Sequence, residues 1–149
     1  MADPIPSGYH TVTPYLRVTG AADFMQFLER AFGAKENHRS LGPDGTIMHA
    51  DVTIGDSHVM LTEGKETFPT LPASLFLYVA DVDATYQKAI EAGATSIMEP
   101  SDQFYGDRTG GVRDPFGNDW WIGTHVEDMS AEELHHRHQQ AMKERHKPS

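Results

Sequence analysis

The sequence contains no cysteine, and this absence excludes several kinds of site at once. Disulfide bonds, thiolate nucleophiles and cysteine-ligated zinc centres all require that residue. A chain without cysteine is compatible with a reducing compartment, so we expect a cytoplasmic protein.

Basic residues are scarce as well, because 12 lysines and arginines stand against 22 acidic residues and leave a formal net charge of −10. Nucleic acids and anionic lipid surfaces both select basic patches. No apolar run approaches the ~18 residues of a membrane span. The opening stretch MADPIPSGYHT has neither the basic region nor the apolar region of a signal peptide. We therefore expect neither a nucleic-acid partner nor a membrane partner.

The pattern of apolar residues repeats once along the chain. Residues 12–18 predict a strand, 21–33 a helix that ends at Gly33, 35–41 a short strand, and 46–54 with 57–63 a hairpin. After a linker at 64–72, the same order follows in 74–80, 81–93, 95–99, 106–114 and 119–125. A lone βαβββ unit leaves one sheet face bare, which two units can share. We predict one α+β domain over 11–125, built from repeats at 11–63 and 74–125.

The remaining residues, 126–149, predict a helical extension. Ser130 and Glu133 form a capping box, and few apolar residues follow, so the helix should lie on the surface. His135 and His138 are spaced to share a metal ion, but two histidines without a third fixed ligand form a weak site. A solvated helix, or one that covers a neighbouring subunit, is the favoured interpretation.

The first hairpin has one polar face that contains a candidate acid–base group. A two-residue turn at Gly55-Asp56 places Thr53 opposite His58 and Asp51 opposite Met60, whereas a turn one residue longer would exchange the faces. His49 and Asp51 then point the same way, about 6.5–7 Å apart. A neutral imidazole near a carboxylate suits a general base, so His49 is the candidate catalytic residue. The alternative is a solvated or dimer-facing surface. Met48, Ala50, Val52, Ile54, Val59 and Leu61 should form the opposite, apolar face.

The duplicated order and the ending DPFGN followed by aromatic residues resemble the glyoxalase/bleomycin-resistance/extradiol-dioxygenase superfamily, which has the vicinal oxygen chelate fold. PYLRVTGAADFMQFLERAFGA, IMHADVTIGDSHVML and GDRTGGVRDPFGNDWWIGTH are similar to its PhnB-like branch. The resemblance implies a cup-shaped mixed sheet of paired modules, in a homodimer whose cups bind small molecules.

Metal-dependent members of this superfamily place His and Glu ligands on the first and last strands of their modules. The matching positions here are Thr13, Ser74 and Trp121, with Val59 or Met60 on the fourth strand depending on the register. None of these side chains is a usual ligand for zinc, nickel, manganese or iron. We therefore expect no metal cofactor at the family position.

Alternation along the strands predicts an aromatic lining for the cup. The candidate ligand-binding residues are Tyr15, Met60, Phe76, Tyr78, Tyr105, Arg108 and Trp121. Such a lining suits flat or apolar ligands, with phenols as polar groups, although some rings could serve only as core. Trp120 should face the helices. Arg108 could bind a carboxylate or phosphate, or else pair with Asp107 or Asp114.

Two functions follow from these features. The chain could bind a small oxygen-rich or aromatic molecule and act on it by acid–base chemistry at His49. Alternatively, it could be a sequestering dimer of the bleomycin-resistance type, for which the acidic charge favours cationic ligands.

Overall fold

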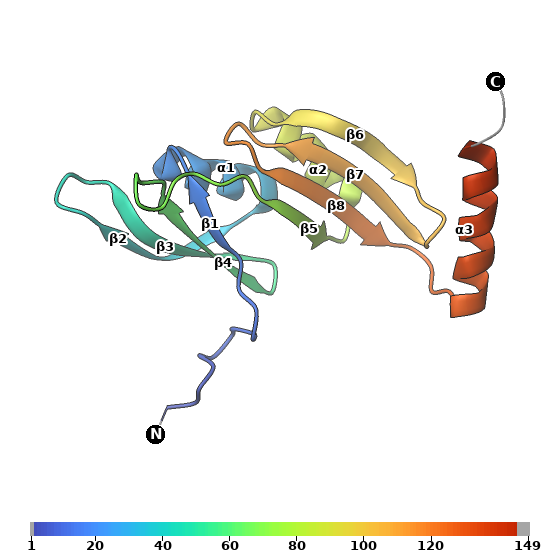
Figure 1. Ribbon diagram of the computed structural model, residues 1–149, viewed down its shortest axis with the longest axis horizontal. Coiled ribbons are helices and arrows are strands. Elements are labelled where there is room, and N and C mark those ends of the chain that lie inside the picture. Colours follow the sequence, from blue (N-terminus) through green and yellow to red (C-terminus); the bar gives the residue numbers. More distant parts are fainter. Residues whose placement is uncertain (1, 146–149) are drawn as a thin grey trace.

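The computed structural model describes residues 2–145 and contains two four-stranded sheets (Figure 1). The elements of the first module are β1 (Tyr15–Val18), α1 (Ala21–Phe32), β2 (Lys35–Leu41), β3 (Ile47–Ile54) and β4 (Ser57–Glu63). Those of the second are β5 (Ser74–Tyr78), α2 (Val82–Glu91), β6 (Thr95–Asp102), β7 (Asp107–Arg113) and β8 (Asp119–His125), and α3 (Ala131–Arg145) follows. The α+β class and the two βαβββ units agree with the prediction.

Both sheets have the same mixed topology. Sheet 1 has the order β1-β4-β3-β2 and sheet 2 the order β5-β8-β7-β6, with the first pair of each sheet parallel and the other pairs antiparallel. In the first hairpin Thr53 lies opposite His58 and Asp51 opposite Met60, as the two-residue turn predicts. The register therefore fixes which side chains share a face.

A single apolar core joins the two modules. Helix α1 buries Phe24 and Leu28 completely, and helix α2 packs beside it. The Phe32 ring lies 4.8 Å from the Trp120 ring, and the Phe24 ring lies 5.3 Å from that of Phe116, so aromatic contacts cross from one module to the other. Trp120 is fully buried, which confirms its predicted place in the core.

Hydrogen bonds at their ends define helices α1 and α2. The Glu63 carboxylate, at the end of β4, accepts from the backbone N–H groups of Gly20 and Ala21 at 2.8 and 2.9 Å. An anionic acceptor at a helix N-terminus satisfies free donors and complements the helix dipole. Gly33 adopts a left-handed conformation at the end of α1, as predicted from its position. In the second module, Asp81 caps α2.

The structure corrects two details of the sequence prediction. The first strand begins at Tyr15, not at residue 12. Met48, expected on the apolar face, is 44% exposed, whereas Ile47 is 3% exposed. Ser40 of β2 pairs with His49 of β3, but the next residue, Leu41, pairs with Ile47, so Met48 is an extra residue in β3. Such an irregularity exchanges the two faces of a strand.

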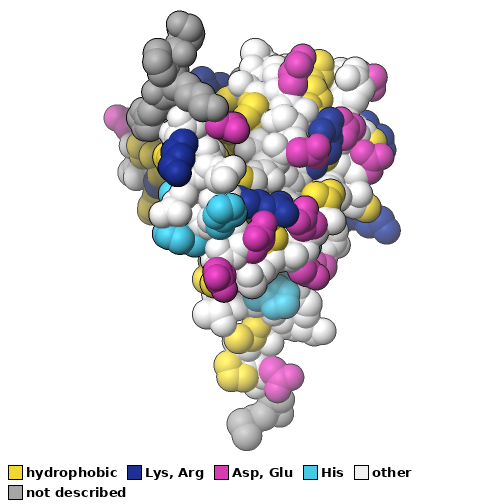
Figure 2. Space-filling model, turned by 90° about the vertical axis from the view of Figure 1, so that its right-hand side faces the viewer, with side chains coloured by type: hydrophobic (Ala, Val, Ile, Leu, Met, Phe, Trp, Pro, Cys, Tyr) yellow, Lys and Arg dark blue, Asp and Glu magenta, His cyan; other side chains and the backbone are white. Residues whose placement is uncertain are grey.

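Helix α3 stands apart from the sheets and buries no side chain (Figure 1). The Ser130 hydroxyl accepts from the Glu133 N–H at 3.1 Å, which confirms the predicted cap. On the face of the molecule shown in Figure 2, acidic and basic side chains are interleaved and hydrophobic ones are scattered. His146 lies outside the described residues. Within residues 2–145, every helix is too short or too polar to span a bilayer.

The turn between β7 and β8 is organised by one buried carboxylate. Asp114 is 3% exposed and its Oδ1 accepts from the N–H groups of Phe116 and Asn118 at 2.8 and 3.0 Å. Its Oδ2 accepts from the Asn118 amide at 3.1 Å and the Trp120 indole at 2.7 Å. The Asn118 oxygen in turn accepts from the N–H of Ala73, so the turn also holds the start of β5.

Replacing Asp114 with Ala should therefore destabilise the fold strongly. Several buried donors, the Trp120 indole among them, would lose their acceptor, and each such loss costs about 1–3 kcal/mol. We expect Asp114→Ala to lower the free energy of unfolding by at least about 3 kcal/mol in urea denaturation. Asp119→Ala, which removes an exposed pair with Arg113, should cost under about 1 kcal/mol. Equal losses in the two variants would contradict this assignment.

Candidate ligand-binding faces

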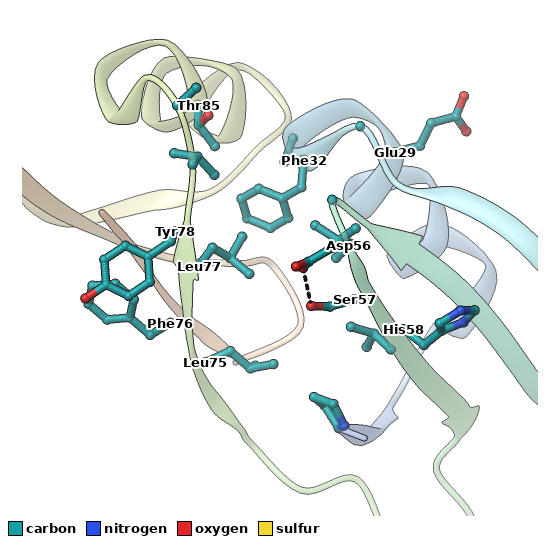
Figure 3. Close-up of a pocket in the computed structure, with 18 of the residues that line it drawn as sticks. Glu29, Phe32, Asp56, Ser57, His58, Leu75, Phe76, Leu77, Tyr78 and Thr85 are labelled. Carbon is teal, nitrogen blue, oxygen red and sulfur yellow. Dashed lines mark hydrogen bonds between the residues drawn. The ribbon is translucent and has the colours of Figure 1, made fainter. Parts of the chain in front are cut away.

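The shared core determines where the polar and aromatic side chains of the sheets lie. Because the core takes one face of each sheet, the opposite faces, here called the outer faces, point away from each other. Figure 3 shows Leu75 and Leu77 of β5 directed into the space between the modules, while Phe76 and Tyr78 turn away from it. His58 of β4 turns away on the other side.

The outer face of sheet 2 carries aromatic rings. Phe76 is 45% and Tyr78 66% exposed, and their ring centroids lie 4.9 Å apart. Phe76 pairs with Trp121 across β5 and β8. A Cβ atom at Gly111 would lie 2.6 Å from the Trp121 ring, and one at Gly123 would lie 2.9 Å from the Phe76 ring. The two glycines therefore allow these rings to lie close against the backbone of the sheet.

A buried carboxylate holds the polar end of this face. Asp107 is 3% exposed and accepts from the Tyr78 hydroxyl at 2.7 Å, while its other oxygen lies 2.7 Å from Nδ1 of His125. The hydrogen bond to Asp107 raises the pKa of Tyr78 and so favours the protonated phenol that donates it. Asp107 is also the main reason, with Asp128, that the pKa of His125 is raised.

Tyr105 and Arg108 were predicted to line the same cup; the structure keeps Tyr105 near this face but pairs Arg108 with a residue of α2. The Tyr105 hydroxyl lies 3.4 Å from the hydroxyl of Thr109, on the strand that carries Asp107. Arg108 binds both carboxylate oxygens of Asp83 in α2, at 2.8 and 3.0 Å, and this pairing raises its pKa. The charged guanidinium is therefore paired with a carboxylate of α2. This partner differs from Asp107 and Asp114, the two considered from the sequence.

The outer face of sheet 1 has a second group of predicted residues. Tyr15 is 51% exposed and pairs with Met60 across β1 and β4. Its hydroxyl lies 3.2 Å from Nδ1 of His49, and the two ring centroids are 5.6 Å apart. Tyr15, His49 and Met60 thus form one neighbourhood, in which a phenol faces the candidate base.

Asp51, expected to orient His49, instead contacts other side chains. Its Oδ1 lies 2.7 Å from Nδ1 of His58 and accepts from the Asn37 amide at 2.7 Å, while Oδ2 accepts from the hydroxyl of Tyr9. Burial disfavours the charge on Asp51, but these three hydrogen bonds together outweigh burial and lower its pKa. The carboxylate therefore stays ionised, although it is only 3% exposed.

The structure thus divides the predicted site residues into two groups. Phe76, Tyr78 and Trp121 lie together on sheet 2, with Tyr105 nearby, and Tyr15, His49 and Met60 lie together on sheet 1. Within one chain the two groups face opposite directions. The sequence did not identify Tyr9, Asn37, Asp107 or His125 as neighbours of these groups. For His125 there was a signal, since alternation along the predicted strand 119–125 places it on the same face as Trp121.

A large cavity in the described part of the chain lies elsewhere. It has a volume of about 1010 Å³ and lies between the modules, where Phe32, Val59, Leu75 and Leu77 contribute to its wall. These side chains belong to the core or pack against it. Because Phe76, Tyr78 and His58 turn away from this space (Figure 3), we place the candidate site on the outer faces.

The residues at the family's metal positions do not fit a metal ion. Met60 is the fourth-strand residue on the outer face, because Val59 is buried, so the four positions hold Thr13, Met60, Ser74 and Trp121. A hydroxyl, a thioether, a second hydroxyl and an indole do not form a usual donor set for zinc, nickel, manganese or iron. Among residues 2–145, His, Asp and Glu side chains nowhere form a group of three suited to a metal ion.

Two βαβββ modules with open outer faces define the class of this fold. A model of the Glyoxalase/Bleomycin resistance protein/Dioxygenase superfamily matches residues 9–122. The uncharacterized protein Rv0887c of Mycobacterium tuberculosis is 40% identical over 134 residues, which cover 83% of this chain and 79% of that protein. Mb0911c of Mycobacterium bovis is also 40% identical, and the match covers 83% of this chain and 88% of that one. The chain belongs to this superfamily.

Solved structures share the fold. TioX from Micromonospora sp. ML1 superimposes with a TM-score of 0.69 and 27% identity, over 78% of this chain and 99% of that chain. The PhnB protein of Bacillus cereus gives a TM-score of 0.63 with 20% identity, over 77% of this chain and 99% of that one. A superfamily enzyme from Burkholderia phytofirmans PsJN gives 0.63 with 21% identity, over 75% and 95%.

The contacts of His125 predict a pH dependence of stability. The pKa of His125 in the folded state is raised above its ordinary value of 6.5. Protonated His125 therefore stabilises the fold fully at pH values below 6.5. This contribution is lost as the pH rises through the folded-state pKa. We expect the melting temperature to fall between about pH 6 and about pH 9 by more in the wild type than in His125→Gln. His135→Gln, in α3, should behave as the wild type does; identical profiles for all three proteins would contradict the assignment.

Proposed function

We propose that this protein binds a flat, aromatic or oxygen-rich small molecule between two copies of the chain. In this homodimer, the outer face of sheet 2 of one copy would lie opposite the outer face of sheet 1 of its partner. The observation that carries the proposal is the set of exposed rings. Tyr15, Phe76 and Tyr78 are each at least 45% exposed. A second copy would cover these rings and leave a cup between them.

The chemistry of the two faces indicates the kind of ligand. Trp121 and Phe76, which lie close to the sheet, offer ring faces for stacking, and the phenols of Tyr15 and Tyr78 offer polar contacts at the edge. The formal charge of −10 favours ligands that are neutral or cationic. Binding without chemistry, as in a sequestering protein, requires no more than these features.

Tryptophan fluorescence tests this binding mode, because the chain has two tryptophans and Trp120 is fully buried. Methyl viologen, a planar aromatic dication that quenches by contact, should quench the wild-type emission with a saturable concentration dependence. Trp121→Phe should lose the saturable component, since only Trp120 remains.

Leu134→Ala is the matched control for that experiment. Leu134 is 38% exposed and lies in α3, which stands apart from both sheets, so quenching should remain saturable in this variant. Sedimentation velocity should show a dimer for all three proteins. A monomeric wild type, or equal quenching with and without Trp121, would contradict the proposed function.

Acid–base chemistry at His49 is the second candidate function. The observation that favours it is the hydrogen-bond distance of 3.2 Å between the Tyr15 hydroxyl and Nδ1 of His49. This contact lets the phenol orient the imidazole, while the other ring nitrogen remains available to a ligand in the cup.

The acid–base candidate predicts proton exchange in a small oxygen-rich ketone. In deuterated buffer, the wild type should accelerate α-proton exchange of dihydroxyacetone as followed by NMR. His49→Ala should lower that acceleration by about 100-fold, within the usual range for loss of a general base. His10→Ala, outside both sheets, serves as control. If the wild type does not accelerate the α-proton exchange, or if His49→Ala accelerates it equally, the acid–base function is contradicted and only ligand binding without chemistry is retained.

A further inference from the structure

The N-terminal segment ahead of β1 carries one side chain that occupies the outer face of sheet 1. Residues 2–14 contain no helix or strand, and most of their side chains are exposed. Tyr9 differs because its side chain contacts sheet 1. Its ring stacks on that of His58 with centroids 3.8 Å apart and an interplanar angle of 18°. Its hydroxyl donates to Oδ2 of Asp51.

The group beneath Tyr9 is a built acceptor site. Asp51 is 3% exposed, and Asn37 of β2 and His58 of β4 approach its Oδ1 at 2.7 Å each. A buried carboxylate needs donors on both oxygens to offset the loss of water. The donor for Oδ2 is supplied by Tyr9 alone among the described side chains that hydrogen-bond to Asp51.

The segment that brings this donor follows the sheet closely at one point. Gly8 has a φ of 86°, and a Cβ atom there would lie 3.3 Å from Nε2 of His58. The N–H of Tyr9 donates to the carbonyl of Pro6 at 3.0 Å and closes a local turn. Tyr9 therefore rests on sheet 1 through a ring stack and one side-chain hydrogen bond, the contacts that a bound phenol would make.

We propose that the position of Tyr9 is a ligand subsite for a phenol, which the chain's own tyrosine fills until an external phenol displaces it. The proposal rests on the proposed function, because it specifies the ligand class of the cup. The ionised carboxylate of Asp51 selects a hydrogen-bond donor and disfavours an acid, while the flat imidazole of His58 selects an aromatic ring.

The subsite also connects to the residues already assigned to the cup. His49 and Asp51 lie two residues apart on one face of β3, a spacing of about 6.5–7 Å. A ligand whose phenol ring replaces that of Tyr9 could therefore extend toward His49 and Tyr15, and from there toward the aromatic face of a partner subunit.

Competition between Tyr9 and an external phenol gives a measurable signature. A tethered group has an effective concentration of roughly millimolar magnitude, so removing it should tighten the binding of a small phenol by up to about tenfold. The probe is p-cresol, which matches the tyrosine side chain. Its methyl ether, 4-methylanisole, is the matched probe without a donor.

The experiment is an NMR titration of the full chain with both probes, followed at the backbone amides of Asp51 and His58 and at the Trp121 indole. Tyr9→Ala should bind p-cresol up to about tenfold more tightly than the wild type does, with shifts at Asp51 and His58. Tyr86→Ala, which removes a phenol from α2, should leave the affinity unchanged. In Tyr9→Ala/Asp51→Asn, the preference for p-cresol over 4-methylanisole should decrease, because a neutral amide oxygen is a weaker acceptor than a carboxylate.

Three results would overturn the inference: equal p-cresol affinity in wild type and Tyr9→Ala, equal affinity for the two probes in Tyr9→Ala, or an unchanged preference after Asp51→Asn. The spectrum of each variant without probe shows whether the variant is folded. Shifts confined to the Trp121 indole would overturn the subsite on sheet 1 while leaving the proposed binding at the aromatic face of sheet 2 intact.

Discussion

The helix-facing sides of both sheets bury their apolar side chains in one common core, and every other feature of the molecule depends on this packing. Phe32 of the first module meets Trp120 of the second, and Phe24 meets Phe116, so the modules are joined through their helix sides. The outer faces are consequently directed to opposite sides of the chain. The aromatic rings of sheet 2 cannot meet the tyrosine and histidines of sheet 1 unless a second copy brings them together.

The two outer faces share a chemical motif that does not follow from the repeat. On each face a carboxylate only 3% exposed is hydrogen-bonded to a tyrosine hydroxyl and to Nδ1 of a histidine. Asp51 and Asp107 nevertheless occupy different places on their strands, since Asp51 lies opposite Met60 and Asp107 opposite His125. On sheet 2 the tyrosine belongs to a strand, whereas on sheet 1 it comes from the N-terminal segment. The proposed exchange with a ligand is therefore restricted to Tyr9, because Tyr78 is held within the sheet.

Local patterns predicted much of the fold. The turn at Gly55-Asp56 gave the register of the first hairpin, Gly33 marked the end of α1, and alternation assigned Trp120 to the core. These features depend on neighbours in the sequence. Met48 was misplaced because the strand irregularity beside it involves a partner strand, whose register the sequence does not reveal.

The site was harder to predict because its contacts are distant in sequence. Asp83, which binds Arg108, is 25 residues away, and Tyr9 lies 42 residues from Asp51. The start of the chain, with two prolines before Tyr9, has no periodicity that would reveal a contact with sheet 1. The division of the candidate residues other than Arg108 between two opposed faces depends on how the modules pack, and alternation within a strand does not determine that packing.

Subunit complementation tests the central claim, that each cup combines sheet 1 of one copy with sheet 2 of the other. Tyr15→Ala damages one face and Trp121→Ala the other, so homodimers of either variant have no intact cup. After unfolding and refolding as an equal mixture, half of the dimers should be mixed, and each should contain one intact cup. We predict that methyl viologen binding, measured by calorimetry, returns to about a quarter of the wild-type capacity. If the mixture binds no more than the separate variants do, the cup is not shared between subunits and the account is contradicted.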